Sequence, residues 1–203
     1  MGWLRRLIYL DTTVFDDVRS DPTATISGVL IAAAAFLISG IGGWLWWRLN
    51  DFGASGDVFL NSAIAGSLLA LALWGLWIFL TFVTLTQVFR ERAFLEQLLR
   101  VMGLATAPMA LMGFMFIPGI SFGIGVAALA LTFGLTTIAI KSATTADQAQ
   151  VLVANLVGFL VWASVLTLAS SANATTTKPH APGIFLYNTV TSVFDDLVNP
   201  TGE

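Results

Sequence analysis

Five long apolar stretches are the feature that most restricts how this chain can fold. A helix needs about 20 mainly apolar residues to cross the roughly 30 Å hydrocarbon core of a bilayer. The stretches that reach this length are 25–47, 58–89, 98–117, 120–140 and 151–171. Lipid does not tolerate unpaired backbone groups, so each stretch is predicted to be a helix. The expected fold class is therefore all-α integral membrane, a bundle of five transmembrane helices.

The composition agrees with a single membrane domain, predicted to span residues 25–171 between two short tails, 1–24 and 172–203. Hydrophobic residues make up 57% of the chain and charged residues 10%, whereas a soluble domain carries about 25% charged residues. The chain has no Cys and a single His, which excludes cysteine catalysis and an imidazole-rich metal site. Without catalytic spacing elsewhere, we expect no enzyme, no cofactor and no metal. The net charge of −3 gives no support for nucleic-acid binding.

The third and fourth stretches are separated by Pro118 and Gly119, a pair typical of turns. We interpret them as a tight hairpin of two spanning helices, with a re-entrant loop as the alternative. The stretch 58–89 would be roughly 48 Å long as a helix, so it is expected to tilt or to project beyond the bilayer.

Basic residues gather on one side of the predicted bundle, as the positive-inside rule expects of cytoplasmic loops. Seven of the nine fall there: Arg5, Arg6, Arg19, Arg90, Arg92, Arg100 and Lys141. Arg48 and Lys178 fall on the other side. The N-terminus is therefore predicted to be cytoplasmic and, after five crossings, the C-terminus extracytoplasmic.

Small residues recur within the spans, notably around Gly40 and Gly42 and at Gly119-x-x-x-Gly123. This spacing is common where membrane helices pack closely, and a glycine-lined pore is the alternative. The spans carry uncharged polar residues, namely Asn61, Gln87, Asn155, Thr81, Thr84, Thr132, Thr136 and Thr137. We interpret them as partners in interhelical hydrogen bonds, with a hydrophilic cavity as the minority case. No charge lies near the centre of a span, which argues against a pump.

The segment TTVFDDVRSDPT near the start recurs as TSVFDDLVNPTG near the end. In both copies a hydroxyl residue stands three positions before an Asp: Thr13 before Asp16, and Ser192 before Asp195. This resembles a capping box. Apolar residues follow at helical spacing, so each copy is predicted to be a short amphipathic helix lying on a membrane surface.

The five crossings place the two copies on opposite sides of the membrane, so their acidic pairs are not expected to form one site. Two convergent surface helices and a recognition element for one kind of partner both remain open. A second charged pattern, Arg92, Glu96 and Arg100, recurs every four residues and indicates a solvated helix end or a docking surface. The candidate partner contacts are therefore Asp16, Asp17, Asp195, Asp196, Arg92 and Arg100.

In LLRVMGLATAPMALMGFMFIPG, Gly103 and Pro108 form a Gly-x-x-x-x-Pro pattern and Pro118 breaks the helix after it. Together with DPTAT at 21–25 and GLTTIAIKSATTADQAQVLVANLVGF, this stretch resembles the Ypt-interacting-protein (Yip) domain family, bacterial type. The resemblance implies five spanning helices, a cytoplasmic N-terminus and a bacterial inner membrane. Eukaryotic relatives bind prenylated small GTPases, but their Asp-Leu-Tyr-Gly-Pro stretch is missing here. Gly103, Pro108, Pro118 and Gly119 are expected to be structural.

The function that these features favour is a non-catalytic scaffold or accessory subunit that packs against other integral membrane proteins and membrane lipids. A transporter or channel for a small solute or a lipid is the main alternative. It would need a continuous polar cavity lined by Asn61, Thr81, Thr136 and Asn155. A membrane-shaping trafficking factor is the third interpretation.

Overall fold

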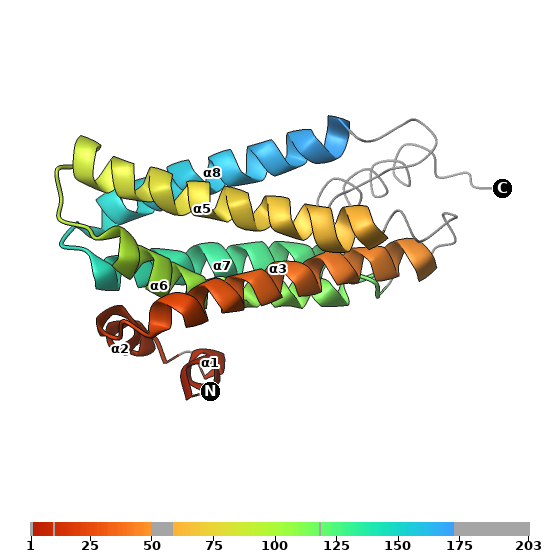
Figure 1. The fold of residues 1–203 in the computed structure, drawn as a ribbon, viewed down its shortest axis with the longest axis horizontal. Coiled ribbons are helices and arrows are strands. Elements are labelled where there is room, and N and C mark those ends of the chain that lie inside the picture. The colour runs from red at the N-terminus through yellow and green to blue at the C-terminus, as the bar shows by residue number, and fades with distance from the viewer. Residues whose placement is uncertain (1, 10, 50–58, 118, 173–203) are drawn as a thin grey trace.

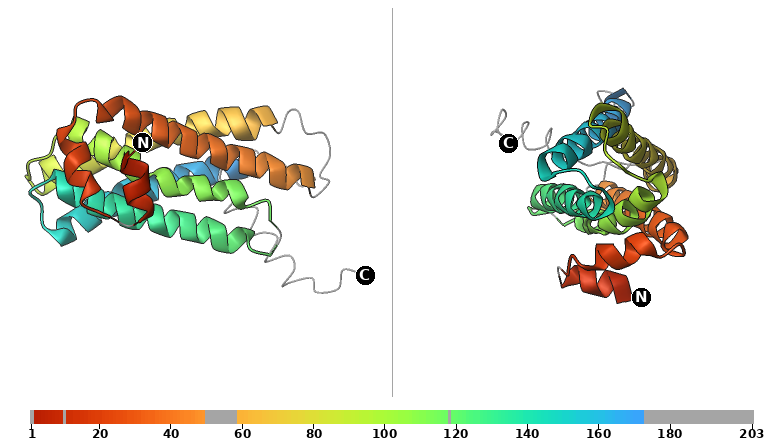
Figure 2. Two further views of the ribbon diagram at one scale, coloured as in Figure 1. Left: turned by 90° about the horizontal axis from the view of Figure 1, so that it is seen from below. Right: turned by 90° about the vertical axis from the view of Figure 1, so that its left-hand side faces the viewer.

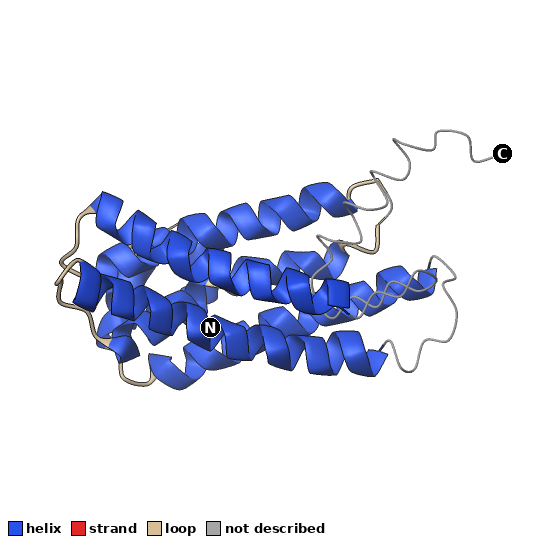
Figure 3. Ribbon diagram, turned by 90° about the horizontal axis from the view of Figure 1, so that it is seen from above, coloured by secondary structure: helices blue, strands red, loops and turns tan. Residues whose placement is uncertain are grey.

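The computed structural model describes residues 2–9, 11–49, 59–117 and 119–172, and in these ranges every regular element is helical (Figure 3). Five helices are long and apolar enough to cross a membrane. The predicted fold class, an all-α bundle of five membrane-spanning helices, is confirmed. The C-terminal copy of the repeat, with Asp195 and Asp196, lies outside the described residues, as does Pro118.

The elements follow the predicted stretches closely. Two short helices, α1 (Gly2–Ile8) and α2 (Val14–Ser20), precede the bundle. The spans are α3 (Ala24–Leu49), α5 (Ser67–Val83) with the π-helical ends η1 (Leu60–Gly66) and η2 (Thr84–Val88), α6 (Leu95–Ala105) continued by the 3-10 helix η3 (Ala107–Phe114), α7 (Ser121–Ala143) and α8 (Gln148–Ala172).

The spans form two groups that run along one long axis (Figure 1). In the first, α3 packs against α6 and η3, and these pack in turn against α7. The second is the pair α5 and α8, which makes its main contact within itself. Helices α1 and α2 lie on the outside of the first group (Figure 2). We call the end of the bundle where α3, α6 and α8 begin the basic end, because Arg19, Arg90, Arg92, Arg100 and Lys141 lie there.

The apolar stretch 98–117 predicted a single α-helix for the third span, but the span is not one continuous α-helix. It begins earlier, at Leu95, and changes to a 3-10 helix at Ala107. Pro108 is the physical reason, because it has no backbone N–H for an α-helical bond. Together α6 and η3 extend roughly 32 Å, enough to cross the hydrocarbon core. Gly119 follows with a φ of +83°, as expected of a tight turn. These features favour the hairpin interpretation over a re-entrant loop.

Close helix contacts occur where glycines face backbone. A Cβ added at Gly103 would lie 2.6 Å from backbone atoms of Gly28, so α6 and α3 cross there at minimal separation. Gly42 meets the backbone of η3 and Gly40 meets that of η1 in the same way. The predicted small-residue packing is confirmed for Gly40 and Gly42.

Gly119-x-x-x-Gly123 makes no such close contact within the described part of the chain, so its predicted role in helix packing stays a prediction. A Cβ at either glycine would meet no described atom within 4 Å. The reason is positional, because Gly119 belongs to the turn and Gly123 lies on the outer side of α7.

Helix α2 is amphipathic, as the first copy of the repeat predicted, but its apolar face does not lie on a membrane surface. Val14 and Phe15 are fully buried and Val18 is 1% exposed. The helix packs these side chains against α6 and α7. Helix α2 therefore packs onto the basic end of this protein and not onto a membrane surface.

Candidate functional site

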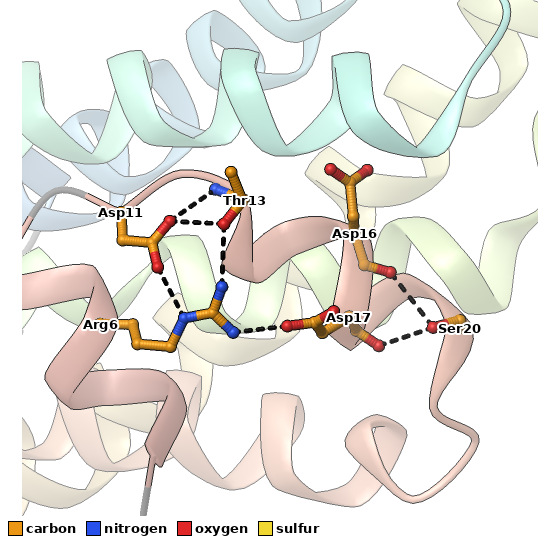
Figure 4. Close-up of polar contacts among 6 residues, drawn as sticks. All are labelled: Arg6, Asp11, Thr13, Asp16, Asp17 and Ser20. Carbon is orange, nitrogen blue, oxygen red and sulfur yellow. Dashed lines mark hydrogen bonds and ion pairs between the residues drawn. The ribbon is translucent and has the colours of Figure 1, made fainter.

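Arg6 is the centre of a polar cluster that joins α1 to the start of α2 (Figure 4). Its Nε donates to the Asp11 carboxylate at 2.7 Å, and its two terminal nitrogens donate to Asp17 at 2.5 Å and to the Thr13 hydroxyl at 2.9 Å. The Thr13 hydroxyl and backbone N–H both donate to Asp11. Together with the backbone bond from the Asp11 N–H to the Arg6 carbonyl at 3.0 Å, these bonds fix α1 relative to α2.

The predicted capping box of Thr13 and Asp16 is wrong. Thr13 occupies the N-cap position of α2, but it makes no side-chain capping bond. Its hydroxyl bonds to Asp11 and Arg6 instead, because Arg6 brings three acceptors together on one side. Asp16 is exposed and its carboxylate points away from this cluster (Figure 4). Of the acidic pair, Asp17 is engaged and Asp16 faces solvent.

Hydrogen bonds in this cluster stabilise the charged forms of both Arg6 and Asp11. Hydrogen bonds from Thr13, and then from Arg6, hold the pKa of the Asp11 carboxyl below its usual range. The bonds to Asp17 and then to Asp11 raise the pKa of Arg6. At the start of α3, bonds from the Thr23 hydroxyl and N–H lower the pKa of Asp21 in the same way. These shifts keep Arg6, Asp11 and Asp21 charged at neutral pH.

Arg100 forms a second node, inside the basic end. Its guanidinium donates to the Thr25 hydroxyl at 2.7 Å, to the Arg19 carbonyl at 3.2 Å and to Glu96 at 3.1 Å. The residue is 9% exposed. Arg100 therefore ties α2, α3 and α6 together. The pattern at 92, 96 and 100 had predicted a solvated helix end, which does not hold at this residue.

Arg92 lies outside the helix, because α6 begins at Leu95, so the predicted ladder of three residues is reduced to Glu96 and Arg100. The Arg92 side chain is exposed. Among the predicted partner contacts in the described part of the chain, Asp16, Asp17 and Arg92 thus remain at the surface, and Arg100 does not.

Asn155 is the hub of the polar interactions between the spans. It is fully buried on α8. Its amide nitrogen donates to the Thr136 and Thr137 hydroxyls of α7 at 2.9 and 2.8 Å, and its oxygen accepts from Trp77 Nε1 of α5 at 3.0 Å. One side chain thus connects three helices, which confirms the prediction of interhelical hydrogen bonds for these residues.

The remaining polar residues of the spans behave in several ways. Thr81 donates across to the Ala154 carbonyl, and Thr84 donates to Leu80 in its own helix. Gln87 is exposed. Thr132 is buried, with no hydrogen-bond partner among the described groups. The side chain of Asn61 lies outside the description. The described residues therefore form packed contacts where the transporter alternative required a polar cavity.

An apolar groove of 560 Å³ opens on the side of the first group. Residues of α3, η3, α7 and α1 line it, and α1 lies toward the basic end of these helices (Figure 2). Leu4, Leu7 and Ile8 are the contributions of α1, and every lining residue is apolar. The sequence did not predict this groove.

The outer face of α7, which the rest of the described chain leaves open, carries a row of small residues flanked by the exposed large residues Phe122, Val126, Leu131 and Ile138. Its exposed small residues recur at helical spacing: Gly123, Ala127, Ala130 and Gly134. We call this row the α7 small-residue face. A Cβ at Gly123 or Gly134 would meet no described atom within 4 Å. The sequence shows the spacing of the glycines, but it does not show which face of the helix the other helices leave uncovered.

Chemically, these surfaces suit binding more than reaction. Within the described ranges, no three His, Cys, Asp or Glu side chains gather closely enough to hold a metal ion. The polar nodes join elements of the chain, while the groove and the α7 small-residue face are apolar. A comparison with family models, curated proteins and solved structures finds no match to this chain.

Proposed function

We propose that this protein is a non-catalytic, Yip-like integral membrane protein that acts as an accessory subunit or scaffold. In this role it packs against a transmembrane helix of another membrane protein. The observation that carries the proposal is the α7 small-residue face, exposed along a helix predicted to span the bilayer. Small residues let two membrane helices approach closely enough for extensive van der Waals contact.

The comparison with α8 supports this assignment. The outer face of α8 presents large branched chains, including Leu152, Leu156, Val157 and Leu160, each at least 40% exposed. Such side chains suit contact with lipid tails. The outer face of α7 also exposes large side chains, but the α7 small-residue face runs between them, whereas the outer face of α8 carries large side chains without such a row. Small residues suit close contact with another helix.

The interior of the bundle supports binding over transport. Of the four residues expected to line a solute path, Asn155, Thr136 and Thr81 are fully buried and hydrogen-bonded, and the side chain of Asn61 lies outside the description. The apolar face of α2 is buried in the protein, which leaves it unavailable for shaping a membrane. Exposed charges at the basic end, Asp16 and Arg92, are proposed as contacts for the partner's loops.

The test is purification from the native membrane in a gentle detergent, followed by identification of the proteins that co-purify. We expect a defined integral membrane partner, and we expect Gly123→Leu to lose it because the new side chain separates the helices. Gly75→Leu is the matched control, since a Cβ at Gly75 on α5 also meets no described atom within 4 Å. Wild-type protein that emerges alone and monodisperse would contradict the proposal.

A further inference from the structure

The apolar groove has the form of a site for a single flexible chain. It holds 560 Å³ between α3, η3 and α7, and it is open along one side. Drug-sized ligand sites fall in the range of about 300–1,000 Å³. The groove exists because small residues, Ala34 on α3 and Ala107 and Ala110 on η3, line it where larger residues would fill it.

The surroundings of the groove identify the chemistry of what enters it. Three of the helices that line it are predicted to span the bilayer. Its mouth therefore faces lipid tails. An entirely apolar lining offers water no hydrogen-bond partner, so water is a poor occupant. A lipid acyl chain matches both the lining and the medium outside.

The charges on α1 indicate which lipid is preferred. Arg5 lies between Leu4 and Ile8, two residues that line the groove, and it is exposed, with its guanidinium 6.0 Å from the Tyr9 ring. Arg6, by contrast, is engaged by Asp11 and Asp17. An exposed cation beside the part of the groove that α1 lines complements the phosphate of an anionic headgroup.

We propose that this groove binds one acyl chain of an anionic phospholipid, with α1 as its cover at the basic end and Arg5 beside the headgroup. The Arg6 cluster positions this cover, because it fixes α1 to α2. This lipid site is separate from the α7 small-residue face. The proposal of a lipid site therefore does not depend on finding a protein partner.

The experiment uses the full chain in nanodiscs that contain phosphatidylglycerol with a photoreactive group on one acyl chain. Cross-linked peptides are then mapped by mass spectrometry. We expect labelling to concentrate on the groove segments of α3 and α7. Labelling spread evenly around the bundle would show ordinary surrounding lipid and would overturn the proposal, without requiring any variant.

Two sets of variants sharpen the result. Ala34→Leu combined with Ala110→Leu fills the groove and is expected to reduce groove labelling roughly tenfold. Ala72→Leu, on the exposed side of α5, should leave the groove labelling unchanged.

The second set tests the headgroup. Arg5→Gln should reduce the preference for phosphatidylglycerol over phosphatidylcholine, while Arg92→Gln at the same end should not. Unchanged groove labelling in the filled variant, or an unchanged lipid preference in Arg5→Gln, would contradict the proposal.

Discussion

Individual polar residues hold this apolar molecule in one arrangement, and Asn155 is the clearest case. Van der Waals packing between membrane helices is weakly directional, so many rotations of one helix against another have similar energies. Asn155 removes that freedom, because its amide bonds to α7 and its oxygen accepts from Trp77 of α5. If the amide is removed, the buried groups that bond to it have no water to replace it as a hydrogen-bond partner.

Replacing Asn155 with Leu is therefore expected to lower the free energy of unfolding by roughly 1–3 kcal/mol, because the Trp77 N–H and two hydroxyls lose a buried partner. Thermal unfolding in detergent, followed by size-exclusion chromatography, measures the change. Ser164→Leu is the control, since Ser164 lies on the exposed side of the same helix. Equal melting temperatures for the two variants would show that the amide has no such role.

The Arg6 cluster makes the position of α1 dependent on pH. The folded pKa of Asp11 lies below its ordinary value of 3.8, so its contribution to stability is present above that value and is lost as the pH falls through the lowered pKa. We expect α1 to stay docked at neutral pH and to detach in acid. Spin labels on Gly2→Cys and Ser20→Cys report the distance, because the native chain has no Cys.

Two substitutions separate this cause from general acid unfolding. Asp11→Asn is expected to broaden the distance distribution at neutral pH, because the Arg6 and Thr13 bonds to the carboxylate weaken. Asp16→Asn should have no effect, since the Asp16 carboxylate points away from Arg6 (Figure 4). If both variants keep a narrow distribution, the cluster does not position α1.

At the scale of elements, the crossing of α3 and α6 is fixed by two glycines. Gly103→Ala would place a methyl group 2.6 Å from the backbone of Gly28, which cannot rotate away as a side chain can. The expected loss of stability is roughly 1–3 kcal/mol. Gly75→Ala, at an open position of α5, should be neutral or slightly stabilising. The two melting temperatures measured side by side test this, and a neutral Gly103→Ala would mean that the helices separate easily.

The elements also show what the sequence could predict. The starts and ends of α3, α7 and α8 lie within three residues of the predicted bounds, because hydrophobic length determines a membrane span. The change to a 3-10 helix at Ala107 was not predicted, since Pro108 also permits a kinked α-helix. Capping at Thr13 was wrong because Arg6, seven residues away, competes for its hydroxyl. The groove depends on which faces the neighbours cover, and a local pattern does not contain that information.

At the scale of the whole molecule, the uneven charge of the two ends predicts the orientation in the membrane. Arg19, Arg100 and Lys141 lie at the basic end, which the positive-inside rule assigns to the cytoplasm. A cysteine at Gln148, at the basic end, should resist a membrane-impermeant maleimide added to intact cells. A cysteine at Leu49, at the opposite end of α3, should react. The reverse pattern would invert the predicted topology.

The two groups of spans are not contiguous along the chain, and this has a consequence for how the protein is made. Helix α5 belongs with α8, but α6 and α7 are synthesised between them. During translation, Trp77 and Thr81 therefore enter the bilayer before Asn155 and Ala154 exist to bond them. Until the last helix emerges, the neighbours of α5 among the finished spans are α3 and α6. A chain stalled before α8 is made would lack the α8 partners of Trp77 and Thr81.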